Sequence, residues 1–286
     1  MMTEHRDLVV DFRARPNLVE YDRYLRPRLD AIDQVTGGRY GAYRAATEDL
    51  AGFVDRLDRA GIDVAVFAAR SRVSTGDWSL TNDVVADAAS QYPDRIVGLA
   101  GIDISDMGAA LREVDRAVGS LGLRGVCIDP FQLAWRPDDP RLDPLYAAVA
   151  EHGVLMVVTM GAMPGVEAPL ACGDPLALDD VAARFPDLSL VGSHAGWPFT
   201  QQMIAVAWRR RNVYFENSFY HHAPGASAIV EAANDMIGHK ILYASAYPFS
   251  PLEETLERFR SLPLRDDVRR EVLGGNACSL LPDLGR

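Results

Sequence analysis

Histidines are the residues of this chain best suited to chemistry, because imidazole is the commonest metal ligand and titrates near neutral pH. The 286 residues include six of them: His5, His152, His194, His221, His222 and His239. None of these forms an HxH or HExxH pattern, the spacing expected of paired metal ligands. His194 stands apart because it ends a short apolar run and precedes Gly196 and Pro198. It is our candidate acid–base group, with a purely structural histidine as the alternative.

Two arginines form a second candidate group. Arg13 and Arg15 alternate at the end of the first apolar run, in the segment VDFRARP. Side chains two residues apart on a strand point to the same face, so we expect both guanidinium groups on one side with Asp11 behind them. Burying such charges is costly without an anionic partner, and each guanidinium offers a planar fork that suits carboxylate or phosphate. The pair therefore predicts an anion-binding site.

Eight short apolar runs, each followed by a segment of helical length, must position these residues. The runs are nearly continuous in Val, Ile, Leu or Ala, which is typical of parallel strands buried on both faces. Such alternation predicts an α/β fold, a closed (β/α)8 TIM barrel. A doubly wound sheet is the alternative, but no GxGxxG follows the first strand. We expect strands at 8–12, 62–67, 96–100, 125–128, 154–159, 188–192, 213–217 and 241–244, and helices at 47–60, 81–91, 108–121, 144–152, 178–185, 201–209 and 224–236.

The chain reads as one domain over residues 1–286. Residues 17–44 follow the first strand and exceed the ordinary length of a βα loop. Loops after strands form the catalytic face of a barrel, so this insertion is a candidate lid.

Composition limits the partners. A net charge of −11 argues against nucleic acid or an anionic membrane as the main partner, since both are bound through positive surface. No run approaches the roughly 18 to 20 apolar residues of a membrane span, and the N-terminal segment carries charges where a signal peptide needs an apolar core. We therefore expect a cytoplasmic protein with a small-molecule substrate. Cys127, Cys172 and Cys278 lack CxxC spacing, which favours reduced thiols.

Segments at the expected strand ends carry a resemblance that covers nearly the whole chain in order. They are NDVVADAA at 82–89, YPDRIVGLA at 92–100, GLRGVCIDP at 122–130, LDDVAARFP at 178–186, VGSHAGWPF at 191–199, NVYF at 212–215, KILYASAYP at 240–248 and NACSLL at 276–281. Together they resemble the amidohydrolase-related family that includes aminocarboxymuconate semialdehyde decarboxylase and metal-dependent aromatic acid decarboxylases. The resemblance implies a distorted TIM barrel, an active site at the carboxyl ends of the strands, and a homodimer.

The same resemblance implies a metal site whose ligands this chain lacks. The family usually holds one divalent metal with His-x-His after strand 1, a His after strand 5 and an Asp after strand 8. The matching positions here are Arg13, Arg15, Thr159 and Ala246. Arginine has no lone pair to offer and alanine has no side-chain donor, so we expect no metal and no cofactor. His194 alone matches a functional position, the acid–base histidine of strand 6.

An electropositive pocket with one histidine suits reactions that pass through an enolate, dienolate or phenolate. We therefore expect a metal-independent enzyme acting on a small unsaturated or aromatic carboxylate, with decarboxylation as the reaction that the resemblance favours. Cyclisation, dehydration and isomerisation use the same groups. Two alternatives stay open: a hydrolase with a relocated metal site built from His194, Glu216, His221 and His222, and a non-catalytic anion-binding barrel.

The remaining candidates surround these groups. Glu216 is expected to orient His194, to act as a base, or to pair with an arginine of strand 1. Asp129 is expected to contact substrate or to cap a turn. The other candidate substrate-binding residues are Arg44, Arg70, Thr159, Trp197, Asn217, Ala246 and Tyr247.

Overall fold

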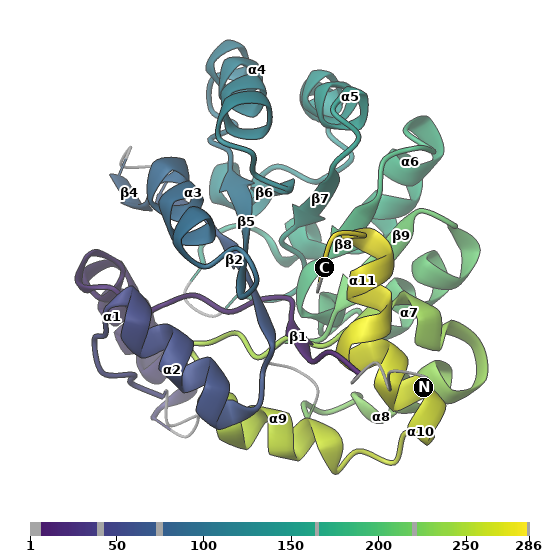
Figure 1. Cartoon of the computed structure of the whole chain (residues 1–286). Coiled ribbons are helices and arrows are strands. Elements are labelled where there is room, and N and C mark those ends of the chain that lie inside the picture. The colour runs from purple at the N-terminus through teal and green to yellow at the C-terminus, as the bar shows by residue number, and fades with distance from the viewer. Residues whose placement is uncertain (1–6, 39–42, 73–76, 164–165, 219–221, 285–286) are drawn as a thin grey trace, which may run out of the picture.

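Eight parallel strands form a nearly closed barrel at the centre of the molecule, and helices surround it (Figure 1). The computed structural model describes residues 7–38, 43–72, 77–163, 166–218 and 222–284. Going round the barrel, the strands are β1 (Val10–Asp11), β2 (Val64–Ala68), β5 (Ile96–Gly101), β6 (Gly125–Ile128), β7 (Leu155–Val158), β8 (Leu190–Gly192), β9 (Val213–Glu216) and β10 (Ile241–Leu242). All eight expected strands are present, which confirms the TIM barrel.

The first and last strands meet just beyond their regular ends. The Phe12 amide donates to the Tyr243 carbonyl oxygen at 2.9 Å, and the Arg15 amide donates to the Tyr247 carbonyl oxygen at 3.1 Å. Ala14 forms an isolated parallel bridge with Tyr247. The barrel is therefore closed by the segments that carry the functional residues, at the carboxyl ends of β1 and β10.

Helices follow the strands in the expected alternation. They are α1 (Val19–Thr36), α2 (Leu50–Ala60), α3 (Asn82–Gln91), α4 (Met107–Val114), α5 (Asp143–Glu151), α6 (Leu176–Arg184), α7 (Thr200–Arg209), α8 (Ser227–Ala232), α9 (Leu252–Arg260), α10 (Asp266–Arg270) and α11 (Asn276–Leu280). The segments expected as single helices at 108–121 and 224–236 each end in a π-helical turn, at Asp115–Ser120 and Ala233–Ile237. Within the described residues, no helix has the length and apolar character needed to cross a bilayer.

Local sequence sets several of these boundaries. The Asp49 side chain accepts from the Gly52 amide at the start of α2, and the Thr81 side chain accepts from the Val84 amide at the start of α3. Such caps satisfy amides that have no partner inside the helix. Gly61 ends α2 in the left-handed conformation that glycine adopts without a steric penalty. These signals explain why the helix positions agree with the sequence pattern.

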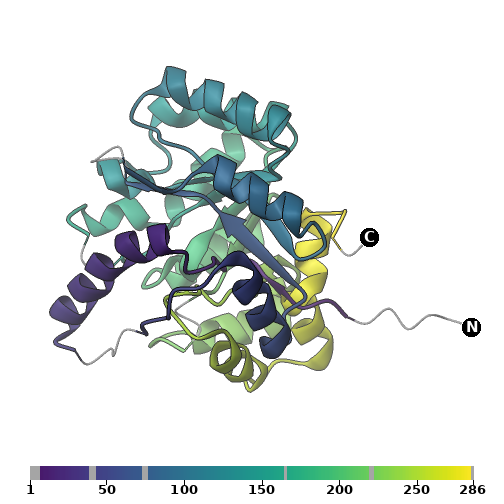
Figure 2. The ribbon, with the colours of Figure 1, turned by 60° about the vertical axis from the view of Figure 1, so that its left-hand side comes forward.

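Two features shape the ends of the barrel. An antiparallel pair of short strands, β3 (Arg70–Arg72) and β4 (Asp77–Leu80), lies between β2 and α3 and was not predicted. Helix α1 occupies much of the 17–44 insertion, contacts β4, and lies on the side of the molecule away from the two chain termini (Figure 2). At the other end, Ala277 and Leu281 share an apolar cluster with interior residues such as Val64 and Leu155. The terminal helix α11 thus closes the bottom of the barrel.

Candidate functional site

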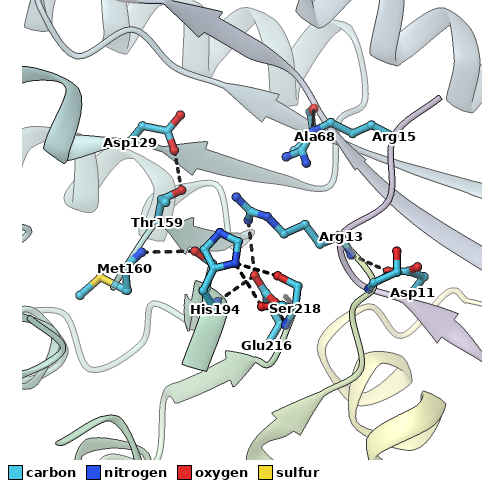
Figure 3. A network of polar contacts seen from close by, with 12 residues as sticks. Asp11, Arg13, Arg15, Ala68, Asp129, Thr159, Met160, His194, Glu216 and Ser218 are labelled. Carbon is cyan, nitrogen blue, oxygen red and sulfur yellow. Dashed lines mark hydrogen bonds and ion pairs between the residues drawn. The ribbon is translucent and has the colours of Figure 1, made fainter. Parts of the chain in front are cut away.

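Polar side chains gather where the carboxyl ends of the strands meet (Figure 3). Arg13 and Arg15 lie just beyond β1 and are 5% and 3% exposed. The strand ends at Asp11 and the backbone turns at Phe12, so alternation along a regular strand does not set the direction of these arginines, although both side chains extend into the same region (Figure 3). Instead the carboxylate of Asp11 accepts from the amides of Arg13 at 3.1 Å and Ser245 at 2.9 Å, which holds the turn.

One group of contacts, which we name the His194 side, comprises Arg13, His194, Glu216 and Ser218. Arg13 reaches from the end of β1 toward the imidazole of His194 (Figure 3). Its Nη1 lies 3.5 Å from Oε1 of Glu216, which ends β9 and is fully buried. Glu216 therefore forms the ion pair that was one of its three expected roles. Glu216 also accepts from the backbone amide of His194 at 3.1 Å.

The imidazole of His194 is instead held by Ser218. Its Nδ1 lies 2.9 Å from the Ser218 hydroxyl oxygen and 3.3 Å from the Ser218 carbonyl oxygen. Burial, together with the positive charge of Arg13, lowers the pKa of His194 well below its ordinary value. The lowered pKa favours the neutral form of the imidazole.

An opposite group, the Asp129 side, comprises Arg70, Asp129, Gln132 and Thr159. Arg70 pairs with Asp129, Thr159 donates its hydroxyl hydrogen to the same carboxylate, and the Gln132 amide donates to it at 3.0 Å. Burial alone would raise the pKa of Asp129, but the charge of Arg70 and the hydrogen bond from Thr159 hold it well below its ordinary value. The predicted residues Arg70, Asp129 and Thr159 thus form one group of contacts around an ionised carboxylate.

Arg15 lies between the two sides and differs from both other arginines. Its Nε donates to the Ala68 carbonyl oxygen at 3.0 Å, and no carboxylate of the described residues lies within ion-pair distance of it. Burial, then the neighbouring charge of Arg70, lowers the pKa of Arg15 to about 10, which leaves it charged at neutral pH. In addition, Nη2 of Arg13 is buried and has no hydrogen-bond partner within the described part of the chain. The site therefore carries guanidinium N–H donors that its own carboxylates do not pair with.

Other predicted residues lie apart from this network. Arg44 pairs with Asp30 and Asp33, both at 2.9 Å, on the exposed surface of α1. The Trp197 indole donates to the Pro224 carbonyl oxygen at 3.0 Å. The structure thus places Arg44 and the indole nitrogen in contacts within the protein surface rather than with the arginines.

The segment after β10 behaves differently from expectation. Ala246 has a φ of +63°, in the left-handed region, and is buried. The Tyr247 ring is fully buried and stacks against Phe53 of α2, while its hydroxyl donates to Glu48. Tyr247 therefore points outward between barrel and helices. Asn217 is buried directly after β9, and its backbone amide donates to the Leu242 carbonyl oxygen at 3.3 Å.

Sequence reasoning missed two contributors. Ser218 contacts His194, but a serine two residues past a strand carries no pattern that would single it out. Tyr21 of α1 is buried, and its phenol lies close enough to Arg15 and Arg70 to influence the pKa of each. The only signal for Tyr21 was its place in the long insertion after the first strand.

The donor set does not fit a catalytic metal. Arg13, Arg15, Thr159 and Ala246 occupy the positions of the expected ligands, and a guanidinium paired with Glu216 adds positive charge where a cation would have to sit. In the described part of the chain, no three His, Cys, Asp or Glu side chains come together to hold a metal. For the relocated site, His222 is exposed, and His221 lies outside the described residues.

Comparison with known proteins agrees with this architecture. The family model described as amidohydrolase matches residues 10–282, almost the entire chain. The chain belongs to the amidohydrolase family. This confirms the resemblance drawn from the strand-end segments.

Several proteins are similar to this amidohydrolase in sequence or structure. The 2-amino-3-carboxymuconate-6-semialdehyde decarboxylase of Dictyostelium discoideum is 24% identical and is aligned over 80% of this chain and 75% of its own length. An uncharacterized TIM-barrel protein of Bordetella bronchiseptica is 31% identical, with a TM-score of 0.82 over 97% of this chain and 99% of its own. A dihydroxybenzoic acid decarboxylase of Polaromonas, solved with bound manganese, is 14% identical, with a TM-score of 0.70 over 97% of both chains. The semialdehyde decarboxylase and a gamma-resorcylate decarboxylase of Polaromonas, which is 22% identical, are decarboxylases, which supports an enzyme of the lyase type.

Proposed function

We propose that this amidohydrolase is a metal-independent lyase that decarboxylates a small unsaturated or aromatic carboxylate. Arg15 binds the carboxylate, Arg13 stabilises the developing oxyanion, and His194 moves the proton. Decarboxylation is the choice because the named relatives are decarboxylases of carboxymuconate and dihydroxybenzoate compounds.

One observation carries the proposal: the buried guanidinium of Arg15 has no carboxylate partner among the described residues. Arg13 and Arg70 each have a carboxylate partner, in Glu216 and Asp129. Arg15 has no such partner among the described residues, although it is only 3% exposed. A buried cation without a counterion is unfavourable by several kcal/mol, and a well-placed bound anion offsets part of this cost. An anionic substrate beside Arg15 therefore supplies the negative charge that the described residues do not place there.

The neutral imidazole suits proton transfer within the substrate. For a substrate with a hydroxyl group next to the carboxylate-bearing carbon, His194 accepts the hydroxyl proton while Arg13 stabilises the oxyanion. The proton then passes from His194 to that carbon, the carbon–carboxylate bond breaks, and its electron pair restores the unsaturated system as CO2 leaves. The oxyanion is reprotonated from water, so each turnover consumes one proton from solvent.

We extend the proposal to residues 17–44, as a lid over the carboxyl ends of the strands. Tyr21 of α1 supports this role, because its phenol is buried close to Arg15 and Arg70. An aromatic side chain there excludes water from the arginines and strengthens their interaction with an anion.

The experiment is a panel of unsaturated and aromatic carboxylates incubated with the protein in D2O and followed by ¹H NMR. We expect loss of the carboxyl group and deuterium at the carbon that carried it, and no turnover with His194→Gln. Turnover without CO2 would identify isomerisation, dehydration or cyclisation instead. If no compound turns over while carboxylates raise the melting temperature, the protein is an anion-binding barrel and the proposal is wrong.

A further inference from the structure

Two oxygen atoms of Ser218 contact one ring nitrogen of the candidate acid–base histidine. The Ser218 hydroxyl oxygen lies 2.9 Å and its carbonyl oxygen 3.3 Å from Nδ1 of His194. A hydroxyl can donate or accept, but a carbonyl oxygen only accepts. Both contacts are satisfied together when Nδ1 carries the proton. In the neutral imidazole the lone pair is then on Nε2.

Glu216 fixes the positions of both residues. Its Oε2 accepts from the Ser218 amide at 2.6 Å, and its Oε1 accepts from the His194 amide at 3.1 Å. With Arg13 at 3.5 Å, each carboxylate oxygen already interacts with a donor inside the protein. Glu216 is fully buried, so these contacts leave it poorly placed to take a proton from a substrate.

The backbone at His194 makes this anchoring important. His194 and Ala195 have φ values of +59° and +49°, in the left-handed region. That region costs roughly 1–2 kcal/mol for each residue other than glycine, so it persists only where neighbouring contacts hold it. The hydrogen bond from the His194 amide to Glu216 is such a contact. It directs the imidazole toward Ser218 and Arg13, as Figure 3 shows.

We infer that Ser218 is a positioning residue that keeps His194 in the Nδ1–H tautomer, so that Nε2 is the atom that exchanges protons with substrate. Glu216 is the second positioning residue, and it acts through Ser218 and the His194 backbone rather than as the base. The inference rests on the proposed function for the role of His194, but the tautomer itself can be measured without turnover.

The experiment is ¹⁵N NMR of the protein labelled at histidine, with His194 assigned by comparison with His194→Gln. We expect a pyrrole-type nitrogen at Nδ1 and a pyridine-type nitrogen at Nε2. Ser218→Ala is expected to raise the share of the other tautomer about fivefold, the effect of losing one ordinary hydrogen bond. Ser218→Thr keeps a hydroxyl and is expected to retain the wild-type spectrum.

Ser193→Ala is the matched control. Ser193 precedes His194, and its hydroxyl accepts from the Met160 amide at 3.2 Å rather than contacting the ring. Its loss is expected to lower the melting temperature without changing the tautomer of His194. A pyridine-type Nδ1 in the wild type, or a Ser218→Ala spectrum identical to wild type, would overturn the inference.

Kinetics separate this inference from the proposed function. Ser218→Ala is expected to lower kcat about fivefold with KM unchanged, because substrate anchoring by Arg15 is untouched. If His194→Gln is as active as wild type, the proposed function fails whatever the tautomer. If His194→Gln is inactive but Ser218→Ala retains full kcat, the proposed function stands and the role of Ser218 is wrong.

Discussion

The His194 side and the Asp129 side of the barrel mouth are built from similar parts but have different electrostatics. Each pairs one arginine with one buried carboxylate, Arg13 with Glu216 and Arg70 with Asp129. Asp129 accepts side-chain hydrogen bonds from three residues and its pKa is held well below the ordinary value, so it stays ionised. Glu216 instead binds backbone amides and places a neutral histidine. In the proposed mechanism the His194 side transfers the proton and the Asp129 side provides rigid support.

The largest expected effect is on catalysis at the His194 side. His194→Gln keeps a polar side chain of similar size but cannot relay a proton near neutral pH. Loss of general acid–base catalysis predicts a fall in kcat of about 10²- to 10⁴-fold. Steady-state kinetics on the substrate found in the panel, with a melting curve to confirm folding, checks it. A kcat within twofold of wild type would place the chemistry elsewhere.

Asp129→Asn tests the Asp129 side through stability. The change leaves the guanidinium of Arg70 buried beside a neutral amide, and breaking a buried pair costs about 3–5 kcal/mol in the free energy of unfolding. Urea unfolding measures the loss. The matched control is Asp187→Asn, which breaks the exposed Arg211–Asp187 pair of 3.0 Å and is expected to cost less than about 1 kcal/mol. Equal losses in the two variants would contradict the rigid-support role.

Asp11, which accepts from the Arg13 amide, is expected to make the stability of the protein depend on pH. Burial raises the pKa of Asp11 from 3.8 to about 6. The native state therefore binds more protons than the unfolded chain between these values, and this group's contribution to stability falls as pH rises from about 4 to 6. The full effect is up to about 3 kcal/mol.

The pH dependence of Asp11 is isolated by subtraction. The lowered pKa of His194 acts in the opposite direction over part of the same range, since the unfolded histidine is protonated first as pH falls. We therefore compare the free energy of unfolding of wild type and Asp11→Asn at several pH values from 4 to 8. The difference between the two proteins is expected to change across pH 4–6 and to become constant above pH 7. If the difference in free energy of unfolding does not vary with pH, the titration of Asp11 does not contribute to the pH dependence of stability.

Substitution of Arg15 is expected to give the smallest of these changes in free energy. Because Arg15 belongs to neither side, it tests substrate binding separately from both. Arg15→Ala is expected to raise KM about 10- to 100-fold, the value of a hydrogen bond to a charged group, with a smaller change in kcat. Arg15→Lys is expected to recover part of the affinity, since an ammonium keeps the charge and loses the planar fork. If Arg15→Ala binds the carboxylate as tightly as wild type, Arg15 is structural.

Much of this arrangement follows from the sequence because strand ends meet at one place. Apolar runs located all eight strands, and the ends of those runs brought six of the predicted residues into two groups of contacts at one end of the barrel: Arg13, His194 and Glu216, and Arg70, Asp129 and Thr159. The barrel geometry converts such positions into proximity without any knowledge of side-chain directions. For that reason the proximity of these residues was predictable from the sequence.

Backbone irregularity defeated the finer predictions. The turn after Asp11 and the left-handed Ala246 leave no trace in hydrophobic periodicity, yet they set where Arg13 points and send Tyr247 outward against Phe53. Ser218 acts through both its hydroxyl and its carbonyl oxygen, and no residue-type pattern predicts a contact made partly by backbone. Arg44 lies beside the acidic face of α1, which became visible only once the insertion was known to be helical.

Under the proposed function, arginines supply the positive charge that manganese supplies in a relative such as the Polaromonas decarboxylase. The most direct test of this role measures metal content and turnover on the same sample, before and after exhaustive dialysis against a chelator, with the substrate identified by the carboxylate panel. We predict undiminished kcat/KM in protein that holds far less than one equivalent of any transition metal. Activity that disappears with chelation and returns in proportion to added zinc or manganese would contradict the account.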